Sequence, residues 1–396
     1  MRIGILTFHR SINYGAFMQC YSLCQRLQRD FPQHSIEVID YTSDRIQEMY
    51  DREIREADPL TQKLLSQRAE AFRSVYSHLP LSPQCLIGEG GQELSDWMNS
   101  RYDAVIVGSD AVWNWILRGF PNPYFLKDYH GIKLSYAASA HGQRFRTMTP
   151  QQKLYLQEAF RDFAYLGVRD VTTEQLLSYV DPELRPQHNC DPTMFLDPEA
   201  LPCDMEELKQ KLSRRGVDFS KPLIGIMGSS KNIGRELKQH FGNRVQFVAL
   251  YWENSWADVY LHDLNPFEWA RVFSLFSATV THFFHGTLLS LVNGTPVFAA
   301  ETASTFALEY TTKIADVLGR LDLLQYRSLS LGCRRSFLQR VWSKLGFSVD
   351  RAMWESICRE IETVLEGQVP AIAQKVEREA RSYENFRAAL ESCLNR

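Results

Sequence analysis

The segment from Phe276 to Ala299 constrains the fold more than any other part of the sequence. It begins with a short apolar stretch, residues 276–280, and ends with a second one, residues 295–299. Between them lie a turn and a helical apolar pattern that stops at Gly294. Strand, turn, helix and strand in this order form a βαβ unit. A chain organised around such a unit is expected to belong to the α/β class.

The turn of this unit is a candidate functional site. It lies at the carboxyl end of a strand and opens a helix, where free backbone N–H groups and the positive end of the helix dipole favour an anion. It carries His285, whose side chain exchanges a proton near neutral pH, followed by Gly286 and Thr287. A plain strand-to-helix turn with a capping histidine explains the same local pattern, so both interpretations stay open at this point.

The same order of elements recurs along the chain. In the first half, the apolar patterns predict strands at residues 1–8, 35–41, 104–107, 133–139 and 165–168. The pattern starts again at residues 223–227, after a polar stretch at 201–220 that we interpret as a linker. This restart predicts a second α/β domain. We therefore expect Rossmann-like domains at 1–205, with a helical insertion at 43–100, and at 206–345, and C-terminal helices at 346–396 that brace the two domains.

Polar side chains follow several of these strands. Ligands bind at the carboxyl ends of strands in α/β sheets, so the side chains there are candidates for a cleft or an acceptor site. They are His9, Asn13, Gly15, Ser109, Asn114, Ser139 and His141 in the first domain, and Ser229 in the second. Asp110 and Arg169 occupy equivalent turns and are candidates for catalysis.

Structural explanations compete at several of these positions. Asn13 suits a simple turn, Ser109 or Asp110 suits a helix cap, and Arg169 could pair with Asp170 or another local acid. The first turn also lacks the G-x-G-x-x-G pattern of dinucleotide-binding domains.

Composition excludes several classes of function. The formal net charge is −3 and no basic run is present, so nucleic acid is not an expected partner. No apolar stretch approaches the ~20 residues that span a bilayer, and a strand begins at once, without a signal peptide. The eight cysteines are scattered without CxxC or Cys/His clusters, so no metal site is expected. These features predict a soluble, cytoplasmic protein without a transmembrane segment.

Several segments, taken together and in order, resemble the polysaccharide pyruvyl transferase family across about residues 1–325. They are TFHRSINYGAFMQCYSL, YDAVIVGSDAVWN, YFLKDYHGIKLSYAAS, GVRD, CDPTMFLD, THFFHGTLLSLVNGTPVFA and TTKIADVLGRL. The resemblance implies two Rossmann-like domains that face a cleft, as in GT-B glycosyltransferases. It also implies transfer of the enolpyruvyl unit of phosphoenolpyruvate onto a sugar as a cyclic ketal, with loss of phosphate and without a cofactor.

The resemblance also assigns residues. Arg169 matches the arginine of the family's donor site, and His285 matches the histidine of its His-Gly turn, with Gly286 and Thr287 beside it. Lys313 is a further cation candidate for the donor, and Asp110 could orient the acceptor together with His9 or Asn13. One position departs from part of the family, because Phe283 stands where those members carry an arginine that can hold phosphate.

The reaction needs cations for two anionic groups, an acid, a base and a dry cleft. We expect Arg169 and His285 to act on one anion at the junction of the domains. The acceptor would be a sugar of a cell-surface polysaccharide or its precursor, and a lipid-linked acceptor would require peripheral membrane contact. Two alternatives are a GT-B glycosyltransferase, which would require a nucleotide sugar, and a non-catalytic relative, which would bind saccharide without turnover.

Overall fold

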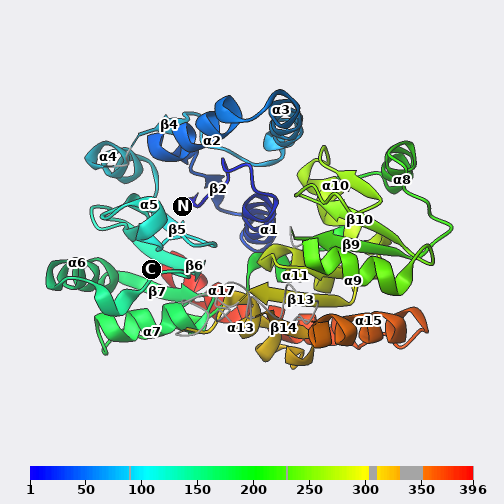
Figure 1. The fold of residues 1–396 in the computed structure, drawn as a ribbon. Helices are drawn as coiled ribbons and strands as arrows, with labels where there is room; N and C mark the ends of the chain where they lie inside the picture. The colour runs from blue at the N-terminus through cyan, green and yellow to red at the C-terminus, as the bar shows by residue number, and fades with distance from the viewer. Residues whose placement is uncertain (89–90, 229–230, 303–309, 331–350, 396) are drawn as a thin grey trace. The chain divides into compact units, whose positions relative to one another are not determined.

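The computed structural model describes residues 1–88, 91–228, 231–302, 310–330 and 351–395 of the chain (Figure 1). It divides into two compact units, residues 1–196 with 378–396, and residues 197–377. The sequence suggested a boundary at 205/206 and a tail that forms a separate part. In the structure, the tail contributes helices to both units. That the tail braces the two domains stays a prediction.

Unit 1 contains a six-stranded parallel sheet in the order β2-β1-β5-β6-β7-β8. Its strands are β1 Arg2–Leu6, β2 Ser35–Val38, β5 Ala104–Val107, β6 Ile132–Ala138, β7 Phe163–Val168 and β8 Gln187–His188. The chain adds β2 on one side of β1 and the later strands on the other side, beginning with β5. Ligands bind at such a reversal because the turns after the two neighbouring strands diverge there.

The helices of unit 1 include α1 Tyr14–Asp30, α5 Trp115–Arg118, α6 Pro150–Arg161, α7 Val171–Val180 and α17 Tyr383–Leu394. The predicted insertion holds α2 Asp44–Glu56, α3 Pro59–Arg73 and α4 Gln92–Arg101. It also holds β4 Leu86–Ile87, which pairs with β3 Tyr41–Thr42 just before it. Phe72 of α3 packs against Tyr14 and Phe17 of α1, with ring centroids 4.7 and 6.5 Å apart. The insertion is therefore anchored on the first helix of the fold.

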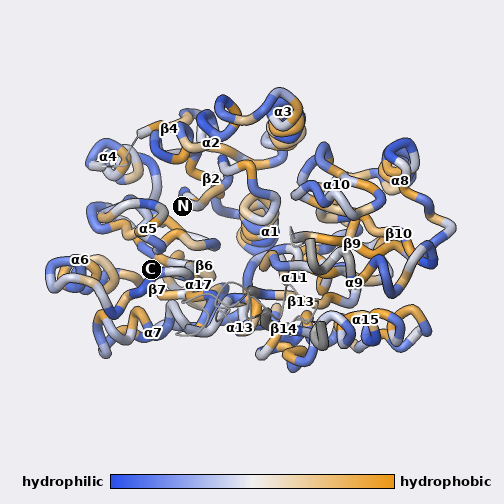
Figure 2. Tube along the Cα trace, in the orientation of Figure 1, coloured by the Kyte–Doolittle hydropathy of each residue, from blue (hydrophilic) through white to orange (hydrophobic). Residues whose placement is uncertain are grey.

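The last helix of the chain, α17, covers the sheet of unit 1. Its Phe386 is fully buried, and its ring lies 4.9 Å from that of Tyr136 in β6 and 5.5 Å from that of Tyr165 in β7. Hydrophobic residues line the strands of this sheet, whereas hydrophilic residues lie along outer helices and loops (Figure 2). The C-terminal segment is thus part of the core of unit 1.

Unit 2 contains a second six-stranded parallel sheet, in the order β11-β10-β9-β12-β13-β14. Its strands are β9 Leu223–Met227, β10 Gln246–Leu250, β11 Val259–Leu261, β12 Ala278–Thr281, β13 Val297–Thr302 and β14 Arg327–Ser330. In chain order this is 3-2-1-4-5-6, the order of the Rossmann fold. The reversal lies between β9 and β12, so the turns after these two strands are neighbours.

The helices described in unit 2 include α8 Met205–Arg214, α9 Lys231–Phe241, α10 Pro266–Val272, α11 Phe284–Val292, α13 Lys313–Arg320 and α15 Arg351–Leu365, with α16 Ile372–Ala380 at its end. From the tail, α15 packs Trp354, Ile357 and Ile361 into the same core cluster as Ile224 and Phe247 of the sheet.

The stretch interpreted as a linker, residues 201–220, contains helix α8, Met205–Arg214. Asp204 caps α8 by accepting hydrogen bonds from the backbone N–H groups of Glu206 and Glu207. Leu208 and Leu212, four residues apart, are buried on one face. The charged composition concealed this helix because only one narrow side of it is apolar.

We expect Phe386→Ala to destabilise unit 1 by about 3–5 kcal/mol, because a buried phenylalanine leaves a cavity in the core. Phe219→Ala makes the same chemical change at a side chain that is 40% exposed, and it should stay within about 0.5 kcal/mol of the wild type. Urea unfolding followed by circular dichroism measures both. Equal effects of the two substitutions would contradict the packing of α17 described above.

Candidate functional site

Arg169 follows β7 and lies in a cluster of carboxylates at the edge of the unit 1 sheet. Its Nη1 donates to Asp191 Oδ2 at 2.7 Å, and its Nη2 donates to Asp110 Oδ1 at 3.5 Å. The residue is only 4% exposed. Burial alone would lower the pKa of Arg169, but the charges of Asp191 and Asp110 raise it above its ordinary value. The guanidinium is therefore a permanent cation whose charge is already balanced by carboxylates.

Asp191 is the member of this cluster that sequence reasoning missed. Its Oδ1 accepts hydrogen bonds from the backbone N–H and the hydroxyl of Thr193, and its Oδ2 accepts one from the Ser109 hydroxyl at 3.4 Å. Gln19 of α1 accepts from the backbone N–H of Ser109. Asp191 thus holds Arg169 and Ser109 in place. Its signal in the sequence, an aspartate before a proline, indicates only a cap for the short helical turn that follows.

The turn after β5 presents Asp110 to the edge of the sheet. Gly108 has φ +112°, and a Cβ there would lie 2.3 Å from the carbonyl oxygen of Tyr136, so only glycine fits. Asp110 has φ +83°, a conformation that costs roughly 1–3 kcal/mol outside glycine. Its Oδ1 accepts from the backbone N–H of Ala111. The Asp110 side chain is 14% exposed and that of Asp191 is 1% exposed, so Asp110 offers the more accessible carboxylate.

Ser139, Asn114 and His141 belong to a hydrogen-bonded turn beside this cluster. The Ser139 hydroxyl donates to Asp170 Oδ2 at 2.5 Å and accepts from the backbone N–H of His141. Asn114 donates to the carbonyl oxygen of His141 at 2.6 Å. Asp170 also caps α7 by accepting from the backbone N–H of Thr173. Asp170 thus binds Ser139 and the start of α7, whereas Asp191 and Asp110 pair with Arg169. The contacts of Ser139 and Asn114 stabilise the turn itself.

The turn after β1 contains a second charged group. His9 Nε2 lies 2.9 Å from Asp40 Oδ1, and Arg10 donates to both oxygens of Asp40. Burial alone would raise the pKa of Asp40, but the hydrogen bonds from Arg10 and His9 hold it below its ordinary value. Asn13 caps α1 by accepting from the backbone N–H of Ala16, and Gly15 is buried in the first turn of that helix. The local structural role that the sequence allowed for Asn13 is therefore found, as a cap at the start of α1.

In unit 2, α11 begins directly at the carboxyl end of β12. The Thr281 hydroxyl accepts from the backbone N–H of Phe283 at 2.9 Å. A Cβ at Gly286 would lie 2.7 Å from both Met227 Sδ and Thr281 Oγ1, so glycine lets the helix start this close to the sheet. Thr287 is buried and its hydroxyl donates to the carbonyl oxygen of Phe283. The first N–H groups of α11 have no acceptor within the helix, which makes its start a place for an anion.

His285 and Lys313 lie against the same aromatic ring, that of Phe284. The ring centroids of Phe284 and His285 are 5.2 Å apart, and Lys313 Nζ lies 5.1 Å from the centroid of Phe284. Lys313 is the first residue of α13, directly after the capping Thr312. Thr312 in turn donates to Glu301, so the lysine is placed by a fixed helix start. The structure thus brings together the two unit 2 donor candidates; Ser229 lies outside the described residues.

An aromatic group at the same edge was not predicted. Phe283 packs against Tyr251, with ring centroids 5.4 Å apart, and Tyr251 packs against Trp252 at 5.2 Å. Trp252 is 45% exposed, and Tyr251 has φ +70°. These two residues follow β10, where the sequence showed only the end of a strand. At Phe283, an aromatic contact therefore takes the place of a cationic side chain.

Within the described parts of the chain, no group of three or more His, Cys, Asp or Glu side chains is placed to hold a metal ion. Among the helices described, none has the length and apolar character needed to cross a bilayer.

Comparisons with known proteins agree with the sequence motifs. A family model described as Polysaccharide pyruvyl transferase matches residues 13–303. No curated protein matches the sequence. Solved structures with a similar fold include UDP-GlcNAc 2-epimerase from Neisseria meningitidis bound to UDP-GlcNAc, at 11% identity and a TM-score of 0.53 over 100% of both chains. UDP-GlcNAc 2-epimerase from Methanocaldococcus jannaschii has 9% identity and a TM-score of 0.52, over 97% of this chain and 100% of its own.

At these identities the likeness concerns the fold alone. It confirms the predicted GT-B-like class, with Rossmann-like α/β domains and a helical C-terminal tail. The expectation that the domains face a cleft stays a prediction, as does the joint action of Arg169 in unit 1 and His285 in unit 2 on one anion.

We expect Asp191→Ala to lower the free energy of unfolding by about 3–5 kcal/mol, because it leaves the buried Arg169 short of a carboxylate. Asp197→Ala is the matched control. Asp197 caps a similar short helical turn by accepting from the backbone N–H of Glu199, and it pairs with no arginine in the part of the chain that the structure describes. Loss of that cap should cost only about 1 kcal/mol. Chemical unfolding of both variants measures the difference, and equal losses would show that the ion pair adds nothing.

Proposed function

Because the chain belongs to the polysaccharide pyruvyl transferase family, we propose that it transfers the pyruvyl unit of phosphoenolpyruvate onto a sugar as a cyclic ketal. The sugar belongs to a cell-surface polysaccharide or its precursor. One observation supports the donor most directly: His285 and Lys313 flank Phe284 where α11 begins, at the strand-order reversal of the unit 2 sheet.

The chemistry of the donor suits this edge of unit 2. Phosphoenolpyruvate carries a carboxylate and a phosphate, and both need cationic or N–H partners. The start of α11 supplies N–H donors and a positive dipole end. Lys313 supplies a charge, and His285 supplies a group that holds or releases a proton. In this proposal Lys313 and the helix start replace the arginine that Phe283 has displaced.

The proposed reaction proceeds by addition to the double bond and loss of phosphate. A proton adds to the methylene carbon, which becomes a methyl group, and one sugar hydroxyl oxygen bonds to the central carbon. The bond from that carbon to the phosphate oxygen then breaks, and a second hydroxyl oxygen of the sugar takes its place. The two hydroxyl protons balance the proton gained by the methyl group and the proton carried away by phosphate.

We assign the acid and the base of this reaction to different units. His285 gives the proton to the methylene carbon. Asp110 accepts a hydrogen bond from a sugar hydroxyl and takes its proton, because it is the accessible carboxylate of the unit 1 cluster. Arg169 lies 3.5 Å from Asp110 as its positive partner, and a direct contact between Arg169 and the donor is a further part of the proposal. We place the reaction in the cytoplasm, with a lipid-linked precursor as an acceptor to be tested first.

We expect His285→Asn to lower kcat with phosphoenolpyruvate by about 10²–10⁴-fold, because asparagine keeps a hydrogen bond but transfers no proton. The Michaelis constant for the donor should change much less. His130→Asn makes the same change at an exposed histidine and should leave kcat unaltered. Phosphate release, measured with purified variants and lipid-linked oligosaccharides, gives both constants.

The alternative functions predict other results in the same assay. Near wild-type turnover of His285→Asn would make His285 an anchor and move the acid elsewhere, with His141 as the next candidate. Turnover that requires a nucleotide sugar and ignores phosphoenolpyruvate would replace the proposal with a glycosyltransferase. Saccharide binding without turnover of either donor would identify a non-catalytic relative.

Lys313→Gln should weaken binding of phosphoenolpyruvate about tenfold or more, because a charge-assisted hydrogen bond contributes about 1.5–3 kcal/mol. Its effect should fall on the dissociation constant of the donor, which isothermal titration calorimetry measures without an acceptor. Lys221→Gln, at an exposed lysine of the same unit, is the control. If both variants bind the donor as the wild type does, Lys313 is not part of the donor site.

A further inference from the structure

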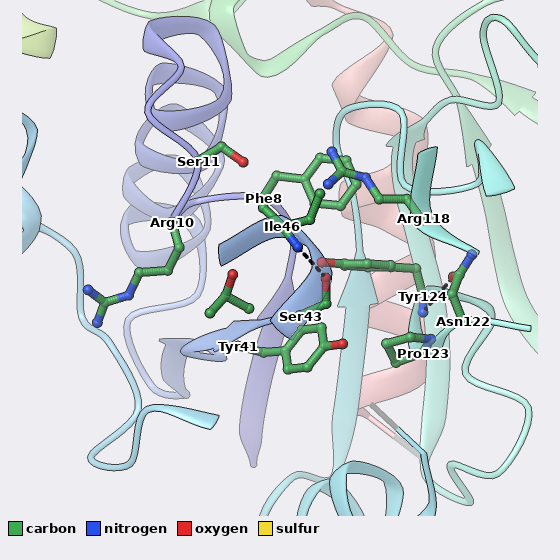
Figure 3. A pocket seen from close by; sticks show the side chains of 11 residues that line it. Phe8, Arg10, Ser11, Tyr41, Ser43, Ile46, Arg118, Asn122, Pro123 and Tyr124 are labelled. Carbon is green, nitrogen blue, oxygen red and sulfur yellow. Dashed lines mark hydrogen bonds between the residues drawn. The ribbon is translucent and has the colours of Figure 1, made fainter. Parts of the chain in front are cut away.

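Unit 1 contains a pocket that the proposed chemistry does not use (Figure 3). Three segments of the chain meet around it: the turn after β1 with Phe8, the segment of β3 and the residue after it with Tyr41 and Ser43, and the stretch from Arg118 to Tyr124. It lies beside the turn after β1, which is one of the two turns at the strand-order reversal of this sheet. Its lining combines aromatic rings, hydroxyl groups and arginine.

The two arginines of the pocket differ in their partners. Arg10 binds both carboxylate oxygens of Asp40 and lies over the ring of Tyr76, so its charge is balanced. The guanidinium carbon of Arg118 lies 3.3 Å from the centroid of Phe8. Within the part of the chain that the structure describes, the buried Nε of Arg118 has no hydrogen-bond partner and the residue forms no ion pair. Figure 3 shows Arg118 across the ring of Phe8, with Arg10 turned away from it.

A guanidinium stacked on an aromatic ring keeps its N–H donors free in its own plane. Those donors match the oxygens of a carboxylate or a phosphate, which they bind through two parallel hydrogen bonds. Since Arg10 is already paired and Arg118 is not, the pocket offers one uncompensated positive charge. An anionic group is the ligand chemistry that this charge recognises.

The other walls of the pocket hold hydroxyl groups in fixed places beside Arg118. Phe8, Tyr41 and Tyr124 are each no more than 6% exposed, and their rings pack edge to face. Burial raises the pKa of Tyr124, so its hydroxyl stays a donor. Ser43 accepts a hydrogen bond from the backbone N–H of Ile46 and keeps its own O–H to donate. Hydroxyl donors beside a guanidinium add hydrogen bonds to a bound carboxylate or phosphate.

We propose that this pocket binds the oxyanion of an acidic sugar, with Arg118 on the carboxylate or phosphate group and the hydroxyl groups of Ser43 and Tyr124 beside it. In one respect the proposal rests on the proposed function, because it identifies the sugar acceptor of that reaction as acidic. The binding itself requires neither a donor nor turnover.

Calorimetry with three ligands that share one ring tests the proposal: glucose, glucuronate and glucose 6-phosphate. At least one acidic sugar should bind about tenfold or more tightly than glucose, because a charge-assisted contact is lost with the neutral sugar. Glucuronate against glucose 6-phosphate distinguishes a carboxylate from a phosphate source. Arg118→Gln should abolish the preference, and Arg118→Lys should retain part of it, since lysine keeps the charge without the planar fork.

Arg144→Gln, at an exposed arginine of the same unit, should leave the preference intact. Matching circular dichroism spectra and melting temperatures ensure that loss of binding is not loss of folding. Equal affinity for all three sugars, no binding of any, or an unchanged preference in Arg118→Gln would overturn the proposal. Loss of phosphoenolpyruvate binding in Arg118→Gln would also overturn it, by making the pocket a donor site.

The outcomes separate this inference from the proposed function. If acidic sugars bind through Arg118 but pyruvyl transfer is not detected with any acceptor, the proposed function fails alone. If transfer proceeds onto neutral sugars and Arg118→Gln does not impair it, the inference fails alone.

Discussion

The reversal of strand order in each parallel sheet is the constraint on which the rest of the structure depends. In unit 1 the reversal lies between β1 and β5, and in unit 2 between β9 and β12. Parallel strands end at one edge, so each reversal opens that edge between two diverging turns. These turns pack closely against neighbouring segments, because a Cβ at Gly108 or Gly286 would collide with neighbouring atoms. The candidate residues of both units follow from this geometry.

The two edges carry different chemistry. In unit 1, Arg169 lies between two carboxylates, which can accept hydrogen bonds from hydroxyl groups. In unit 2, Lys313 and His285 lie near the start of a helix, where positive partial charge collects. We therefore propose that the sugar binds mainly to unit 1 and the anionic donor mainly to unit 2, with Arg169 as the proposed donor contact from unit 1. The pocket around Arg118 extends the same division, because it adds a place for an acidic group of the sugar.

The sequence predicted the frame of the fold well and the partners of its charged residues poorly. Residues 104–107 and 223–227 were predicted as strands with the bounds that the structure has, because short, continuous apolar runs mark buried parallel strands. Helix α8 was missed because its charged residues outnumber its two buried leucines. Asp191 shows only the signal of a helix cap in the sequence, and Arg118 shows no local signal. Their importance comes from partners far away in the sequence, Arg169 and Phe8, which only the folded chain brings to them.

The central claim is that a pyruvyl unit is transferred from phosphoenolpyruvate, and one experiment in D₂O tests it directly. The purified protein is incubated with phosphoenolpyruvate and lipid-linked oligosaccharides, and the products are analysed by mass spectrometry. The account predicts an oligosaccharide heavier by one pyruvate less one water, with a single deuterium in the new methyl group and one phosphate released for each transfer. An unchanged oligosaccharide in this mixture, together with a glycosyl mass gain when a nucleotide sugar is supplied instead, would contradict it.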